Sequence, residues 1–163
     1  LPGFQLGNSP LEYTAEMVAG RSVVFSTTNG TAAIKAAGGG STVVIGSFLN
    51  LGAVAEHAVR LGVDVTLAGA GAGGRPVLDD AVCAGMLAQR MQELTGGSAV
   101  LTDAAQLALH AAQPYHGQLL TLLRDSFSGR ALLEIGYGQD LEFCARLDAL
   151  PIVPTLRDGW ITT

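Results

Sequence analysis

Three short apolar runs, each followed by small polar residues or glycine and then by a helical pattern, constrain the fold of this chain most strongly. The runs lie at residues 22–27, 42–45 and 64–68. Strand–loop–helix units that follow one another closely are typical of right-handed parallel βαβ topology. Continuous apolar strands also fit a sheet that is covered on both faces. The sequence therefore predicts a three-layer α/β/α sandwich with a mainly parallel sheet.

The rest of the chain carries helix signals and ends in a predicted hairpin. Two short runs, 152–155 and 160–163, flank the turn sequence Asp158-Gly159. No linker divides the chain, so we predict a single α/β domain over residues 1–163 with a helical C-terminal part. Caps and apolar spacing predict helices over 32–37, 50–61, 79–94, 103–112, 117–125, 128–135 and 140–147.

The charge content narrows the possible partners. Charged residues make up 14% of the 163 residues, against about 25% in ordinary soluble domains. Lys35 is the only lysine and the net charge is −5, which argues against nucleic-acid binding. No stretch reaches the roughly 20 apolar residues of a membrane span. So few charges leave apolar surface, which favours a homodimer.

The two cysteines and the first residue give two further expectations. Cys83 and Cys144 are far apart and lack metal-ligand spacing, which is typical of a reduced cytoplasmic protein. The chain begins with Leu1 and not with Met. We therefore expect that the natural protein is longer and that an N-terminal part is absent here.

Polar residues after the first run suggest an anion site. Residues 26–31 read Ser-Thr-Thr-Asn-Gly-Thr and precede a helical pattern. Helix N-termini offer unpaired N–H groups and a positive dipole end, which suit phosphate or sulfonate oxygens. Ordinary helix capping, or a hairpin formed at Asn29-Gly30, explains the same residues.

A glycine loop follows the third run. Gly69, Gly71 and Gly74 match the dinucleotide-binding spacing G-x-G-x-x-G. The match is weak because the chain has 22 glycines. It also lacks a ribose-binding acid about 20 residues further on that follows a second strand. Glu93, at that distance, falls inside a predicted helix.

Asp79 and Asp80 begin the helix after the glycine loop. They fit two explanations equally well, namely charges that complement the helix dipole or ligands for a hard cation such as Mg²⁺. We expect ordinary structural roles for His57, His110 and His116, whose spacings are unrelated, and for Cys83, which has no adjacent base.

Several segments together resemble the 2-phosphosulfolactate phosphatase family of coenzyme M biosynthesis. The resemblance covers essentially the whole chain and corresponds to the C-terminal two-thirds of such a protein. Ala32 and Ala72 depart from the family pattern, which often has Arg and Thr there. The segments that carry the resemblance are 3–4, 8–13, 26–31, 45–50, 70–71, 79–80, 83–85, 140–141 and 153–154.

This resemblance implies a Mg²⁺-dependent phosphatase that hydrolyses 2-phospho-3-sulfolactate, or a related small phosphorylated acid, to 3-sulfolactate and phosphate. It implies that Asp79 and Asp80 are catalytic and bind the metal. The alternatives are a non-catalytic module for small anions or nucleotides and a structural subunit of an oligomer. The implied substrate-binding residues are Asn8, Ser9, Thr27, Thr28, Asn29, Gly30, Thr31, Ser47, Asn50 and Gly71. We predict that they line one anion pocket facing Asp79 or Asp80, at the carboxyl edge of the sheet.

Overall fold

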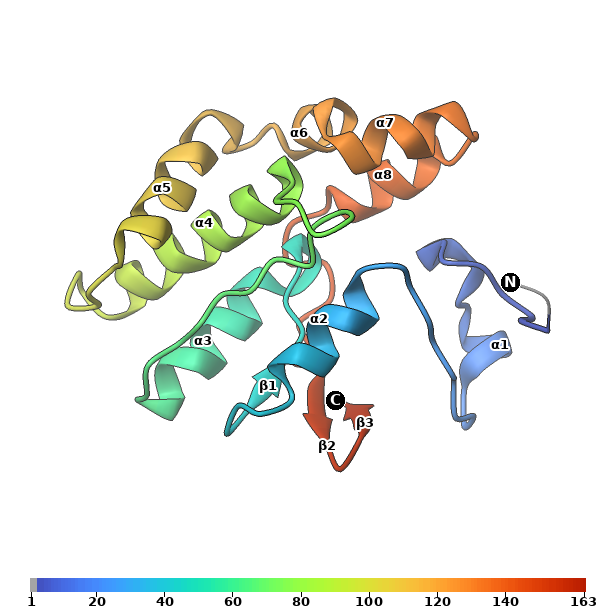
Figure 1. Cartoon of the computed structure of the whole chain (residues 1–163), viewed down its shortest axis with the longest axis horizontal. Helices are drawn as coiled ribbons and strands as arrows, with labels where there is room; N and C mark the ends of the chain where they lie inside the picture. Colours follow the sequence, from blue (N-terminus) through green and yellow to red (C-terminus); the bar gives the residue numbers. More distant parts are fainter. Residues whose placement is uncertain (1–2) are drawn as a thin grey trace.

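The computed structural model describes residues 3–163, which form helices packed above a small sheet (Figure 1). The strands are β1 (Val43–Val44), β2 (Thr155–Arg157) and β3 (Trp160–Thr162). Three short 3-10 turns are η1 (Pro10–Glu12), η2 (Phe48–Asn50) and η3 (Gln113–Tyr115). The α-helices are α1 (Ala15–Val18), α2 (Gly30–Ala37), α3 (Leu51–Leu61), α4 (Leu78–Leu94), α5 (Asp103–Ala112), α6 (Leu119–Asp125), α7 (Phe127–Glu134) and α8 (Gly138–Cys144).

The apolar core lies around α4. Helix α5 packs along one side of α4 and α3 along another, while α6 contacts it near the core (Figure 1). Val82 of α4 and Leu122 of α6 are both 0% exposed, as are Ala55 of α3 and Ala112 of α5. One buried cluster therefore holds four helices together.

The predicted helices are confirmed because their start signals are local. The Thr102 hydroxyl accepts a hydrogen bond from the backbone N–H of Ala105 at 3.3 Å and caps α5. The cap of helix α7 lies two residues earlier than expected, and the helix begins at Phe127. Its cap is the buried Ser126, whose hydroxyl accepts from the N–H of Gly129 at 2.9 Å. The predicted cap, Ser128, is a residue of the helix.

The C-terminal hairpin is confirmed, and it pairs with β1. The sheet order is β1-β2-β3, and both pairs are antiparallel. Val43 lies opposite Leu156, and Leu156 lies opposite Ile161. The chain is thus α/β, with a small antiparallel sheet below the helices (Figure 1).

The predicted parallel sandwich is wrong. Within the predicted run 42–45, only Val43 and Val44 form a strand, and they pair with β2. Residues 22–27 and 64–68 belong to no strand of the structure described for 3–163. β-propensity marks a segment that can form a strand, whereas a strand also needs a partner, which the order of runs does not identify.

The N-terminal segment attaches to the helical layer through a buried polar contact. Turn η1 packs against α8, and the Ser9 hydroxyl donates to Oδ1 of Asp140 at 2.7 Å. The ring of Tyr13 meets that of Phe25 edge-on, with centroids 6.0 Å apart. The stretch between α1 and α2 is extended and connects the N-terminal segment with α2 (Figure 1).

Hydropathy of the helices gives one further result. None of the helices found over residues 3–163 combines the length and the apolar character that crossing a bilayer requires.

The contact between α4 and α5 generates a stability prediction. A Cβ on Gly85 would lie 2.0 Å from the carbonyl oxygen of Ala108. Gly85→Ala should therefore lower the free energy of unfolding by about 1–3 kcal/mol, although alanine favours a helix interior by about 1 kcal/mol. Gly39→Ala is the matched control, since its Cβ meets nothing within 4 Å. Urea unfolding of both variants measures the difference, and equal stabilities would contradict the close contact.

Candidate functional site

The polar turn before α2 is held by its own threonines. Oγ1 of Thr27 accepts a hydrogen bond from the backbone N–H of Thr31 at 3.0 Å, and the Thr31 hydroxyl donates to the Thr27 carbonyl at 2.8 Å. Gly30 begins α2, and Thr28 is exposed. The turn therefore places the exposed side chain of Thr28 next to the start of α2.

Asn29 joins this turn to the glycine loop. Its side chain does not cap α2. Instead, Oδ1 of Asn29 accepts from the backbone N–H of Gly73 at 3.2 Å. Two segments that are remote in sequence, the loops after the first and third apolar runs, are thus in contact.

The glycine loop closes on itself and on Asp80. Ala72 and Arg75 exchange two backbone hydrogen bonds of 2.9 and 3.1 Å. Gly71 has a φ of +67°, and a Cβ there would lie 2.6 Å from the Arg75 carbonyl oxygen, so the position requires glycine. The N–H of Gly71 donates to Oδ2 of Asp80 at 2.6 Å. This glycine thus serves a tight turn anchored to α4.

The carboxylate of Asp79 is in a different environment from that of Asp80. Oδ1 of Asp79 is buried and has no hydrogen-bond partner within the described part of the chain. Burial raises the pKa of Asp79, the neighbouring Asp80 carboxylate adds to the rise, and backbone N–H groups and the nearby Ser128 hydroxyl offset part of it. An unpartnered buried oxygen is unfavourable unless something donates to it or coordinates it.

These two acids are chemically suited to a hard cation. Mg²⁺ is commonly held by one or two carboxylates together with water and substrate oxygens. Among residues 3–163 there is no group of three or more His, Cys, Asp or Glu side chains that could hold a metal ion. The free Oδ1 of Asp79 beside Asp80 therefore fits a cation completed by substrate and water, and does not fit a cage made of protein ligands alone.

Cys83 lies one helical turn further along α4. Burial first, and then the charges of Asp80 and Asp79, raise the pKa of its thiol to about 12. A thiol with this pKa stays protonated at neutral pH and is a poor nucleophile. Cys83 packs against the apolar core, which agrees with the structural role expected for it.

Ser47 and Asn50 form a local capping unit. Oδ1 of Asn50 accepts from the backbone N–H and the hydroxyl of Ser47 at 2.8 and 3.1 Å. The Asn50 amide donates to the carbonyls of Ile45 and Ile152 at 3.0 and 3.1 Å. Asn50 is buried and fully engaged, whereas Ser47 is exposed at a hollow of about 150 Å³.

Asn8 and Ser9 lie on the N-terminal segment. Ser9 is buried, caps η1 and is bonded to Asp140, while Asn8 is exposed. No hydrogen bond found over residues 3–163 joins either side chain to the turn at 27–31 or to the glycine loop. The structure thus brings together the turn, the glycine loop and Asp80, and it gives Ser9 and Asn50 hydrogen bonds elsewhere.

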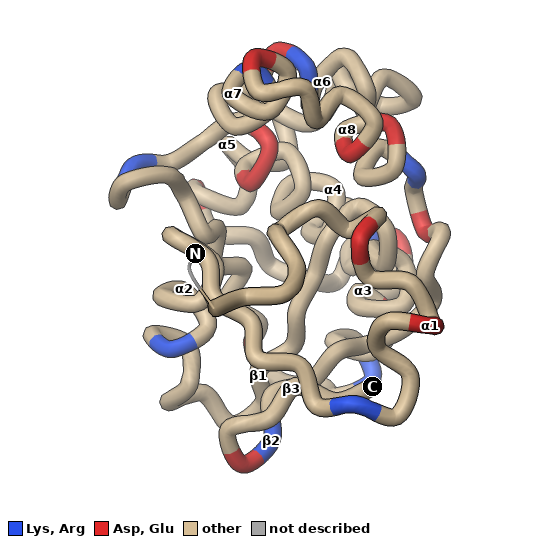
Figure 2. The backbone as a smooth tube through the Cα atoms, turned by 90° about the vertical axis from the view of Figure 1, so that its right-hand side faces the viewer, with Lys and Arg blue, Asp and Glu red and all other residues tan. Residues whose placement is uncertain are grey.

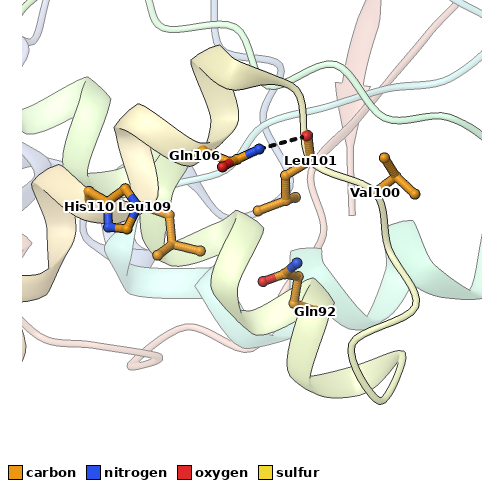
Figure 3. A pocket seen from close by; sticks show the side chains of 6 residues that line it. All are labelled: Gln92, Val100, Leu101, Gln106, Leu109 and His110. Carbon is orange, nitrogen blue, oxygen red and sulfur yellow. Dashed lines mark hydrogen bonds between the residues drawn. The ribbon is translucent and has the colours of Figure 1, made fainter.

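A larger hollow of about 380 Å³ lies at the other end of α4 (Figure 3). The Gln106 amide donates to the Leu101 carbonyl beside it at 3.3 Å. Gln92 is thirteen residues beyond Asp79 in the same helix, which places the hollow about 20 Å from the acids. Its lining residues are Gln92, Val100, Leu101, Gln106, Leu109 and His110.

Arg75 was not among the predicted site residues, and its position makes it a candidate. It lies in the glycine loop, is exposed, and is joined to Ala72 through the backbone. Figure 2 shows that basic residues are sparse and scattered over the backbone. The signal for Arg75 in the sequence is its positive charge in a loop next to two predicted anion-binding segments.

Comparison with known proteins adds independent findings. The family model described as 2-phosphosulpholactate phosphatase matches residues 1–159. A protein of Symbiobacterium thermophilum named "probable 2-phosphosulfolactate phosphatase" is 40% identical over 161 residues, covering 99% of this chain and 69% of its own length. A protein of the same name from Caldanaerobacter subterraneus is 34% identical over 163 residues, covering 100% of this chain and 67% of its own. The chain thus spans about two thirds of the length of these relatives.

The raised pKa of Asp79 generates a pH-dependent prediction. The pKa in the folded protein is above the usual aspartate value of 3.8, so the fold loses stability as pH rises from 3.8 through the raised pKa. Asp79→Asn should remove this loss and raise the melting temperature near pH 7. The gain should correspond to less than about 1 kcal/mol because the side chain is only partly buried, and it should vanish below about pH 3.8.

Thermal unfolding at the two pH values measures this effect. Asp103→Asn, in the first turn of α5, is the control because Asp103 is an exposed acid at an equivalent helix position. A melting temperature that falls in Asp79→Asn near pH 7 would show that the carboxylate stabilises the fold.

Proposed function

The chain belongs to the 2-phosphosulfolactate phosphatase family, and we propose that it carries the anion site of a phosphatase that hydrolyses 2-phospho-3-sulfolactate or a related small phosphorylated acid. The observation that carries this proposal is the linked arrangement of three segments. Asn29 bonds to Gly73, and Gly71 in the same loop bonds to Asp80. The polar turn, the glycine loop and the start of α4 therefore form one continuous surface.

The chemistry of that surface suits an oxyanion. Threonine hydroxyls, backbone N–H groups of the glycine loop and the start of α2 are donors that bind phosphate or sulfonate oxygens. In the reaction, a water oxygen bonds to phosphorus while the bond from phosphorus to the ester oxygen breaks. The leaving ester oxygen takes up a proton to give the hydroxyl of 3-sulfolactate. Donors aimed at the phosphoryl oxygens stabilise the charge that develops there.

We propose Mg²⁺ as the cofactor, held by Asp79 and Asp80. A carboxylate placed about 4 Å from a bound phosphate would be repelled by about 1 kcal/mol even at high dielectric, so a cation between them is expected. When bound, the ion supplies positive charge that neutralises the phosphoryl oxygens. The unpartnered Oδ1 of Asp79 supports this assignment.

Arg75 is proposed as a substrate-binding residue. The substrate carries phosphate, sulfonate and carboxylate groups, and an arginine can bind such groups through two hydrogen bonds. Ala32 stands where the family often has Arg, so the turn lacks that cation, which makes the charge of Arg75 more important. The role in coenzyme M biosynthesis, the cytoplasmic location and the homodimer stay predictions.

The metal assignment is tested by phosphate release from 2-phospho-3-sulfolactate, with and without Mg²⁺. Asp79→Asn and Asp80→Asn, made separately, are each compared with Asp103→Asn. At least one of the two site variants should need about tenfold more Mg²⁺ for half-maximal activity, which is about 1.4 kcal/mol of metal affinity. Normal Mg²⁺ dependence and turnover in both variants would mean that the acids are helix-start charges.

The role of Arg75 has a separate test. Arg75→Gln should raise KM at least tenfold while kcat falls less, because the interaction serves binding in both the ground state and the transition state. Arg60→Gln, on the exposed face of α3, is the control and should leave KM unchanged. An unchanged KM in Arg75→Gln would remove this residue from the site.

A further inference from the structure

Two extended segments have backbone groups without partners. Residues 22–26 and 63–70 belong to no strand, and no backbone-to-backbone hydrogen bond of the described chain uses their N–H or C=O groups. Both segments are mostly β-branched or apolar. A segment of this composition with a free backbone is a strand without its neighbour.

The side chains of these segments are exposed on both faces. Val24 is 81% exposed, and Val23 and Phe25, which point to the opposite face of an extended chain, are 45% and 49% exposed. Val63 and Val65 are 59% and 44% exposed. Strands that are apolar on both faces occur inside covered sheets, so residues 22–26 lack a covering layer as well as a pairing strand. In residues 63–70 the exposed valines share one face with Leu67, which packs against the core, so this segment lacks a pairing strand and is covered only in part.

Residues 22–26 carry none of the devices that protect a free edge, and residues 63–70 carry a single charge, Asp64, and no proline. Natural edge strands use lysine, proline or a bulge to prevent pairing with other chains. Residues 22–34 contain no charged residue and no proline, and Figure 2 shows the uninterrupted uncharged stretch that leads into α2. The unpaired backbone groups of these segments are therefore accessible to another strand.

The total surface indicates how much is missing. The accessible surface is 10391 Å², whereas a compact monomer of this mass exposes about 7,600 Å². The excess of roughly 2,800 Å² is several times the ~800 Å² that each partner buries in a standard interface. An ordinary dimer contact is too small to cover it, but a further part of the same fold is large enough.

We propose that residues 22–26 and 63–70 are the docking edges for additional β-strands, and that the occupant is the third of the relatives' polypeptide that this chain does not match. The relatives from Symbiobacterium and Caldanaerobacter match nearly all of this chain with only 69% and 67% of their own length. The unmatched third is of the right order of size to cover the excess surface. Main-chain hydrogen bonds to both segments provide the attachment.

Hydrogen exchange tests the pairing directly. In this chain alone, the amides of 23–25 and 65–67 should exchange as fast as those of an unstructured peptide. In the intact Symbiobacterium relative, the matching amides should exchange at least tenfold more slowly. Adding the relative's unmatched third to this chain as a separate polypeptide should produce a one-to-one complex by light scattering, with the same protection.

Matched variants identify the surface that is used. Val24→Lys and Val65→Lys should weaken the complex at least tenfold, while Val100→Lys should not, since Val100 is 96% exposed in the loop before α5. Circular dichroism checks that each variant keeps its helices. The proposal is overturned if the matching amides of the intact relative are unprotected, or if the polypeptide does not bind. A protected dimer of this chain alone would instead make a second copy the occupant.

Discussion

The close approach of α5 to α4 is the contact on which the rest of the molecule depends. Gly85 has no side chain, so the Ala108 carbonyl lies directly against the α4 backbone. This contact leaves Val82 and Ala112 fully buried between the two helices, while α3 and α6 fill the other sides of the same cluster. The start of α4 is fixed as a result. The glycine loop is hydrogen-bonded to Asp80 at that start, so the packing of the apolar core also determines where the loop lies.

The helices were predictable from sequence because their signals lie within a few residues of each other. Thr102 and the apolar spacing after it identify α5 without any knowledge of the rest of the chain. The displaced cap of α7 arises because two serines lie two residues apart and only the buried Ser126 is placed to cap. The sheet was not predictable in the same way. Val43 pairs with Leu156, a residue that no local pattern connects with it.

The candidate site shows the same division between local and remote information. Small polar residues after an apolar run predicted an anion site at residues 26–31, and the family resemblance implied Gly71. In the structure Asn29 bonds to the glycine loop and Gly71 bonds to Asp80, without a parallel sheet. The resemblance also implied Asn50, but its amide donates to a carbonyl 102 residues further along the chain. A single asparagine in a sequence carries no sign of such a partner. Arg75, which is proposed here to bind substrate, stands among glycines whose spacing is typical of a different kind of site.

The large sequence separation of these contacts has a consequence for folding during synthesis on the ribosome. Ser9 is hydrogen-bonded to Asp140, which lies 131 positions later, and β1 pairs with β2 of the C-terminal hairpin. At a synthesis rate of about 5–20 residues per second, the first segments are without their partners for roughly ten seconds. During that time Ser9 and β1 lack the contacts that they have in the folded chain. The attachment of the N-terminal segment and the assembly of the sheet therefore come after the synthesis of the C-terminal part.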